Sequence, residues 1–184
     1  MSEEENAKYL DQFPIWLRNL GHEADDIAKL LTVEGMSQDA REAIAGGINY
    51  LFKSLDLIPD GIDNIGYLDD AFVLRVCADL ACREDLGEAT DEQAETLRRL
   101  SDECDLVREF LGEIYPRLET LCVGQRHGSA KGRAVSDVVS DEEICKDLIS
   151  DVTGFAKSYE SPGFTREEKN LLMLKAFFNE KLPH

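Results

Sequence analysis

A stretch of the chain between residues 56 and 70 gathers acidic side chains that could do chemistry. The stretch reads DLIPDGIDNIGYLDD, contains no lysine or arginine, and holds five aspartates: Asp56, Asp60, Asp63, Asp69 and Asp70. Carboxylate oxygens are ligands that Mg²⁺ and Ca²⁺ prefer in proteins, although this spacing is not that of an EF-hand loop. A carboxylate-held Mg²⁺ can also activate water, so a metal-dependent hydrolase extends the same hypothesis. The pattern therefore makes these aspartates candidate ligands of a divalent metal ion.

The same acids can also be explained by the shape of the chain. Pro59 disfavours helical geometry at the residue before it, so we expect the preceding helix to end near Leu57. Asp69 and Asp70 suit the first turn of the next helix, and because adjacent helical residues point about 100° apart, we expect one of the two to face a site. Asp56 would then lie in the last turn of a helix, where negative charge is unfavourable. We expect a cation or a hydrogen-bond donor to offset it.

The letters of this stretch carry a resemblance. DLIPD at residues 56–60, followed by GYLDD at residues 66–70, resembles the signature of the YkvA-like family of small, mostly bacterial helical domains of unknown function. The similarity covers about residues 43–78, under a quarter of the chain, and the family often has proline where this chain has Ser54 and Asp63. The resemblance implies a helical element around a sharp bend, and it implies no particular reaction.

Helical periodicity runs through nearly the whole chain, and no stretch shows the alternation that is typical of a strand. We predict an all-α helical bundle of about six to seven helices, with helices near residues 5–20, 23–31, 37–57, 71–82, 91–123, 141–159 and 166–181. Gly46 and Gly47 fall inside the third of these, where each costs about 1 kcal/mol relative to alanine, so we expect a close helix contact there. We expect residues 1–123 to form the bundle, 124–139 a flexible basic linker, and 140–184 a helical hairpin docked on the bundle.

The longest predicted helix carries an apolar seam with alternating spacings of three and four residues. Its members are Leu97, Leu100, Cys104, Val107, Leu111, Ile114, Leu118 and Leu121. Such a seam packs against an antiparallel helix of the same bundle or forms a coiled-coil dimer. Pro116 should kink or break this helix. For a protein partner or a second copy, the candidate contact residues are Leu97, Leu100, Val107, Leu111 and Ile114.

The charge balance narrows the classes of partner. The formal net charge is −18 and the pI is about 4.5, which argues against a nucleic-acid binder and favours cations or basic partners. The basic segment GQRHGSAKGRAVSD, residues 124–137, lacks the order of a phosphate-binding loop; we interpret it as a mobile linker, or alternatively as a loop that touches an acidic face of this chain or of a partner. No apolar run reaches the 18 to 20 or so residues that cross a bilayer, and the N-terminal segment is acidic, so we expect no membrane association and a cytoplasmic location.

The cysteines and histidines do not assemble into a recognisable site. The five cysteines are odd in number and form no CxxC motif, so we interpret them as buried free thiols in a reducing compartment. Three scattered histidines give neither a zinc ligand pair nor a catalytic triad. The favoured hypothesis is a non-catalytic binding or adaptor protein. The alternative is a divalent-metal-binding protein that uses the five aspartates, with Mg²⁺ or Ca²⁺ as its cofactor.

Overall fold

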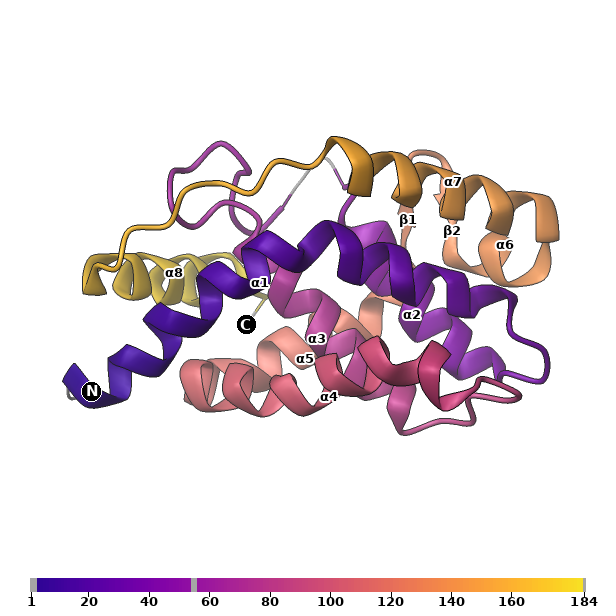
Figure 1. The fold of residues 1–184 in the computed structure, drawn as a ribbon, viewed down its shortest axis with the longest axis horizontal. Helices are drawn as coiled ribbons and strands as arrows, with labels where there is room; N and C mark the ends of the chain where they lie inside the picture. Colours follow the sequence, from indigo (N-terminus) through magenta and orange to yellow (C-terminus); the bar gives the residue numbers. More distant parts are fainter. Residues whose placement is uncertain (1–2, 54–55, 184) are drawn as a thin grey trace.

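The computed structural model describes residues 3–53 and 56–183, and its fold is all-α, as predicted (Figure 1). Ser54, where the YkvA-like family often has proline, lies outside the described residues. The helices and short 3-10 turns are, in chain order, α1 (Glu3–Lys29), η1 (Leu30–Thr32), α2 (Gln38–Tyr50), α3 (Leu68–Cys82), α4 (Asp91–Leu111), η2 (Gly112–Ile114), α5 (Tyr115–Gln125), α6 (Val135–Ser140), α7 (Glu142–Ser158) and α8 (Glu168–Lys181). Within the described residues, no helix has both the length and the apolar composition that a membrane crossing requires.

Helix α3 lies at the centre of the bundle because its sequence is apolar almost all round. Helices α1, α2, α4 and α5 pack around it. Aromatic rings from four helices fill the middle of the core, with ring centroids 5.1 to 5.9 Å apart: Phe13, Trp16, Phe72, Phe110 and Phe178. Most of these pairs meet edge to face, the arrangement that aromatic quadrupoles favour.

The two glycines inside α2 mark the close helix contacts that the sequence indicated. A Cβ atom on Gly47 would stand 2.7 Å from the Cβ atom of Cys77 on α3. A Cβ atom on Gly46 would stand 2.9 Å from the backbone carbonyl carbon of Gln125 on α5. Both separations are too short for any larger side chain, so the close packing offsets the cost of glycine within a helix.

Helix α1 is longer than predicted. It runs without a break through Pro14 and Gly21, where two separate helices were expected. The proline removes one backbone hydrogen bond, but the apolar stripe of α1 continues past it into the core, with Trp16, Leu17 and Leu20 fully buried. Gly21 allows a close approach of α7, since a Cβ atom there would lie 3.2 Å from the Cα atom of Ala156.

Helix α2 is shorter than predicted, which corrects the expected position of Asp56. The helix ends at Tyr50 and not near Leu57, so Asp56 lies in the connection after it and not in a last helical turn. The chain leaves the helix through tight turns, in which the backbone N–H groups of Phe52 and Lys53 donate to carbonyls three residues earlier. Tertiary contacts of Tyr50, described below, direct this early departure.

The predicted helix over residues 91–123 is divided into α4, η2 and α5. The break falls at Gly112, which has a φ of 55°, and Pro116 follows as the second residue of α5, so the expected interruption near the proline is confirmed. The four seam residues of α4 that were candidates for partner contact are buried, with exposed fractions of 0 to 2%: Leu97, Leu100, Val107 and Leu111. Ile114 is half-buried. The seam therefore serves the packing of this chain, and a partner would have to displace α1 and α3 to reach it.

The basic segment after α5 forms secondary structure where a linker was predicted. The strands β1 (Ser129–Ala130) and β2 (Arg133–Ala134) make a small antiparallel hairpin, and α6 follows directly. Val135 and Val138 of α6 are buried in its contact with α2. Arg133 pairs with Asp151 of α7 at 2.8 Å, so the segment touches an acidic face of its own chain. Two-residue strands show no alternation of residue types, which is why the sequence did not reveal them.

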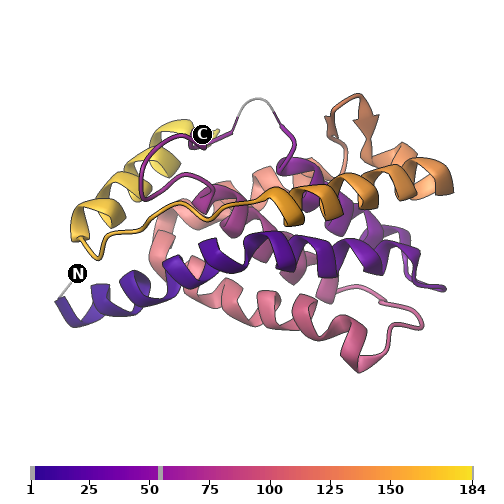
Figure 2. The same ribbon diagram turned by 45° about the horizontal axis from the view of Figure 1, so that its top comes forward.

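The two C-terminal helices do not form the expected hairpin. Each packs on α1, and they lie toward opposite ends of it (Figures 1 and 2). Residues 159–167 between them contain the Ser161-Pro162-Gly163 sequence that predicted a turn, but here they cross the molecule in irregular, non-helical backbone. We call residues 159–167 the strap.

Candidate functional site: the acidic bend

The acidic bend, residues 56–70, is a tight connection that leads into α3. The carbonyl of Pro59 accepts from the N–H of Ile62 at 3.0 Å, and the carbonyl of Ile62 accepts from the N–H of Gly66 at 2.9 Å. A Cβ atom on Gly66 would stand 2.2 Å from the carbonyl oxygen of Asp60, so the fold requires glycine there. Tyr67, directly before α3, has a left-handed φ of 64°, which for a side chain of this size costs about 1 to 2 kcal/mol. Surrounding contacts must hold the bend in this shape.

Asp69 ties the two ends of the bend together. Its side chain is fully buried, and its Oδ2 atom accepts from the hydroxyl of Tyr50 at 2.8 Å and from the backbone N–H of Ile58 at 3.1 Å. The Tyr50 oxygen in turn accepts from the N–H of Leu57 at 3.0 Å. This network joins α2, the start of the bend and the first turn of α3, so Asp69 and Tyr50 set the path of the chain.

Three carboxylate oxygens in the bend are buried without a hydrogen-bond partner. They are Oδ1 of Asp56, Oδ1 of Asp69 and Oδ2 of Asp70. In the part of the chain that the structure describes, none of the aspartates of the bend is within ion-pair distance of a lysine or arginine. A buried charged group without a partner is costly, so these oxygens call for neutralisation by a proton or by a cation.

The pKa values of the bend aspartates rise for the same reason. Burial, followed by the charge of Asp69 and Asp60, raises the pKa of Asp56 to about 7, and Lys53 opposes that rise. Burial raises the pKa of Asp69 to about 6, although the donors Tyr50 and Ile58 lower it. Both groups therefore hold protons more tightly than ordinary aspartates do.

Asp70 and Asp60 complete the group. Burial and then the charges of Asp69, Asp60 and Asp56 raise the pKa of Asp70 well above its usual range. Burial also raises the pKa of Asp60, against a hydrogen bond with Tyr67 that lowers it. Because these carboxylates act on one another, the structure brings Asp56, Asp60, Asp69 and Asp70 into one electrostatic group.

The five predicted aspartates lie in different surroundings. Asp63 is exposed on the surface of the bend and is not among the charges that raise the pKa values of the other four. Asp69 and Asp70 are both buried in the first turn of α3. As they stand, the described residues offer no group of three or more Asp, Glu, His or Cys side chains arranged to hold a metal ion.

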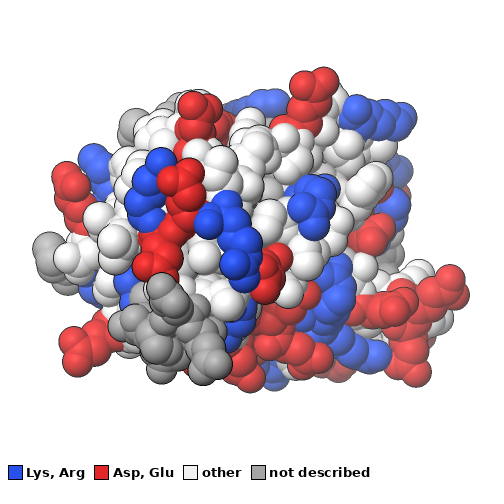
Figure 3. Space-filling model, turned by 60° about the vertical axis from the view of Figure 1, so that its left-hand side comes forward, with Lys and Arg blue, Asp and Glu red and all other residues white. Residues whose placement is uncertain are grey.

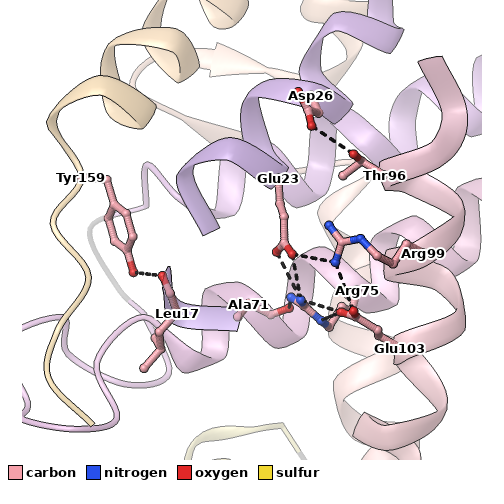
Figure 4. A network of polar contacts seen from close by, with 9 residues as sticks. All are labelled: Leu17, Glu23, Asp26, Ala71, Arg75, Thr96, Arg99, Glu103 and Tyr159. Carbon is pink, nitrogen blue, oxygen red and sulfur yellow. Dashed lines mark hydrogen bonds and ion pairs between the residues drawn. The ribbon is translucent and has the colours of Figure 1, made fainter. Parts of the chain in front are cut away.

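A second buried polar cluster surrounds Arg75 in the middle of α3, and the sequence reasoning missed it (Figure 4). The fully buried guanidinium donates to Glu23 of α1 at 3.2 Å and to Glu103 of α4 at 2.8 Å. It also stacks 3.9 Å from the ring centroid of Trp16. Arg99 completes the group by donating to both glutamates, at 3.0 and 3.1 Å. The signal was present in the sequence, since an arginine alone in an apolar helix must find acids on neighbouring elements.

The surface at one end of the molecule carries charges of both signs. At the end of the molecule shown in Figure 3, lysine and arginine side chains are interleaved with aspartate and glutamate over largely uncharged areas. This face therefore presents a mixture of positive and negative charge.

Comparison with known families finds a match that includes this region. Residues 40–75 match the model of a family described as a protein of unknown function (DUF1232). The match confirms the resemblance to a YkvA-like domain of unknown function, and it spans Tyr50, the whole acidic bend and Arg75. Comparisons with curated proteins and with solved structures found no match.

Proposed function

We propose that this chain, which shares residues 40–75 with a family of unknown function, is a non-catalytic binding protein whose acidic bend takes up a hydrated divalent cation. The observation that carries the proposal is the set of buried, unpartnered carboxylate oxygens on Asp56, Asp69 and Asp70. Unpaired charge in a protein interior is kept only where something compensates it. A cation drawn from solvent would supply that compensation.

The chemistry of the donor set favours a small, hard cation. Mg²⁺ usually keeps several of its water molecules and is held through one or two carboxylates, so it does not require the three-acid cage that the described residues lack. Asp60 is exposed and Asp56 is half-buried, so these two carboxylates would meet an incoming ion first. Asp69 would contribute its free Oδ1 atom while its Oδ2 atom continues to hold Tyr50 and Ile58.

A metal titration tests this proposal. Mg²⁺, Ca²⁺ and Mn²⁺ are titrated by calorimetry into chelator-stripped protein at pH 8, which lies above the pKa of about 7 for Asp56 and of about 6 for Asp69. We expect at least one ion to bind with a Kd on the order of 10⁻⁴ to 10⁻³ M. At ten times that concentration the melting temperature should rise by about 3 to 5 °C, as linkage predicts for a chain of this size. The proposal would be refuted if none of the three ions, at about 10 mM, gave either binding heat or a shift in melting temperature.

Matched variants locate the site. Asp56→Asn and Asp70→Asn each remove one carboxylate of the group, whereas Asp63→Asn removes an exposed carboxylate of the same bend that stands outside it. We expect the first two variants to weaken cation binding about tenfold or more, since each loses a charge that acts on the ion at short range. Equal weakening by Asp63→Asn would mean that the ion responds only to general surface charge.

A further inference from the structure

The strap, which crosses the molecule, is held to α1 near each of its two ends (Figures 2 and 4). On α1, the carbonyl of Leu17 accepts from the hydroxyl of Tyr159 at 2.7 Å, and Asp11 accepts from the guanidinium of Arg166 at 2.9 Å. Most strap residues are exposed. A few polar contacts, rather than a broad buried surface, therefore hold this segment in place.

The strap also holds the acidic bend, at its two left-handed residues. Asn64, with a φ of 71°, accepts from the backbone N–H of Thr165 at 2.6 Å. Tyr67, with a φ of 64°, packs its ring edge to face against Tyr159, with ring centroids 5.3 Å apart. The ring of Phe155, near the end of α7, also lies against the ring of Tyr67, with ring centroids 6.4 Å apart. The unusual backbone of the bend is thus supported from the C-terminal segment.

The contact reaches the carboxylates through Tyr67. Burial and then the charge of Asp60 raise the pKa of Tyr67, so the tyrosine hydroxyl and this carboxylate act on each other. When the strap is docked, the ring and the backbone of the bend keep the acids together. When the strap is released, nothing described at Asn64 replaces the lost donor, and the bend can relax.

The strap is not packed flush against α1. An open surface pocket of about 280 Å³ lies between the two, lined by Pro14 and Arg18 of α1 and by strap residues from Ser161 to Phe164. Segments with few buried contacts and exposed backbone open locally at low cost. The strap is therefore the part of this neighbourhood that is best placed to exchange between docked and released states.

We infer that the strap is a clamp on the acidic bend, so that strap docking and cation occupancy favour each other. This inference rests on the proposed function, because it concerns regulation of the same cation site. Coupling between two sites is reciprocal: a cation that prefers the docked arrangement must stabilise the docked strap by the same factor. A cation would in this way secure the C-terminal segment, and release of that segment would lower cation affinity.

Asn64→Gly tests the clamp without straining the backbone. Glycine adopts the left-handed conformation freely, so the variant deletes only the carboxamide that accepts from Thr165. Thr165→Ala is the matched control, because it removes the side-chain hydroxyl that accepts from Asn170 but keeps the backbone N–H that donates to Asn64. Both variants are made in the full chain, and their melting temperatures confirm that they are folded.

Two measurements are compared: calorimetric affinity for Mg²⁺ or Ca²⁺, and hydrogen–deuterium exchange of residues 159–167 with and without that ion. In the wild type, we expect saturating cation to slow exchange of the strap by about fivefold or more. Asn64→Gly should weaken the cation by a comparable factor and remove the effect of the ion on strap exchange, and Thr165→Ala should behave as the wild type. Cation binding of equal affinity in all three proteins, with unchanged strap exchange, overturns the clamp alone. No cation binding to the wild type overturns the proposed function and the clamp together.

Discussion

Two buried polar groups lie on the same helix and balance their charges in opposite ways. Around Arg75, two arginines meet two glutamates, and the buried guanidinium has acceptors in both acids and in the carbonyl of Ala71. In the acidic bend, four aspartates act on one another, and Lys53 is the cation that lowers the pKa of Asp56. The charges of the group around Arg75 are therefore balanced by residues of the fold itself.

The contrast shows that burial alone does not identify a functional group. A fully paired buried network explains its own presence through structure, whereas buried charges left without partners require a further component. The segment that matches a known family, residues 40–75, contains the acidic bend and also Arg75, so the match by itself does not distinguish the two groups. Their charge balance does, and the following experiments test it.

Arg75→Met should have the largest effect, because it removes the fully buried one of the two arginines that pair with the buried Glu23. We expect a loss of about 3 to 5 kcal/mol in the free energy of unfolding, measured by urea denaturation at pH 7. Arg98→Met is the control, since Arg98 pairs with the highly exposed Asp91 and should change stability by no more than about 0.5 kcal/mol. Equal losses in the two variants would contradict a structural role for the network.

Asp70→Asn should stabilise the protein, in contrast to Arg75→Met. It replaces a buried carboxylate that has an unpartnered oxygen with a neutral amide of the same shape. Without divalent cations, we expect a gain of about 1 to 3 kcal/mol in the free energy of unfolding that grows as the pH rises, because burial raises the pKa of Asp70 and only its charged form is costly to bury. Destabilisation at pH 8 would show that Asp70 has a partner in solution that balances its charge.

Stability of the wild type should fall as the pH rises. Burial raises the pKa of Asp69 to about 6 and that of Asp70 well above its usual range, so above pH 4 the folded state holds more protons than the unfolded chain. Their contribution is fully present below the unfolded pKa and is lost as the pH passes through the folded values. In chelator, we expect the free energy of unfolding to decrease by about 1 to 3 kcal/mol between pH 5 and pH 8. A flat profile would remove the bend as its origin, and the same slope in Asp70→Asn would remove Asp70 as a contributor.

Lys53→Met should give the smallest effect. Lys53 lowers the pKa of Asp56 against the burial that raises it to about 7. Loss of the ammonium group should move the Asp56 titration further above 7, with little change in global stability, as followed by carboxyl-carbon NMR. A downward shift would mean that Lys53 does not act on this carboxylate.

The sequence predicted the elements that depend on local patterns. The helices, the break near Pro116 and the close contact at Gly46 and Gly47 all follow from periodicity, from backbone restrictions or from the absence of a side chain. The all-α class and the family resemblance were confirmed on the same grounds.

The rest depends on contacts between distant residues. Tyr50 leaves the helical path because its hydroxyl bonds Asp69 and Leu57, and no local signal announces those partners. Pro14 stays within α1 because the core on either side outweighs one lost hydrogen bond. The separation of Asp63 from the other aspartates likewise depends on how the bend folds over α3, which residue spacing cannot specify.

The glycine contact between α2 and α3 limits how the bend can move. Where Gly47 faces Cys77, the helices approach so closely that a methyl group would not fit between them. Surfaces interlocked at this distance resist sliding and tilting, since any shift would drive atoms into one another. Rearrangement of the bend must therefore come from rotation of backbone torsions within residues 56–67, while the two helices remain a fixed frame.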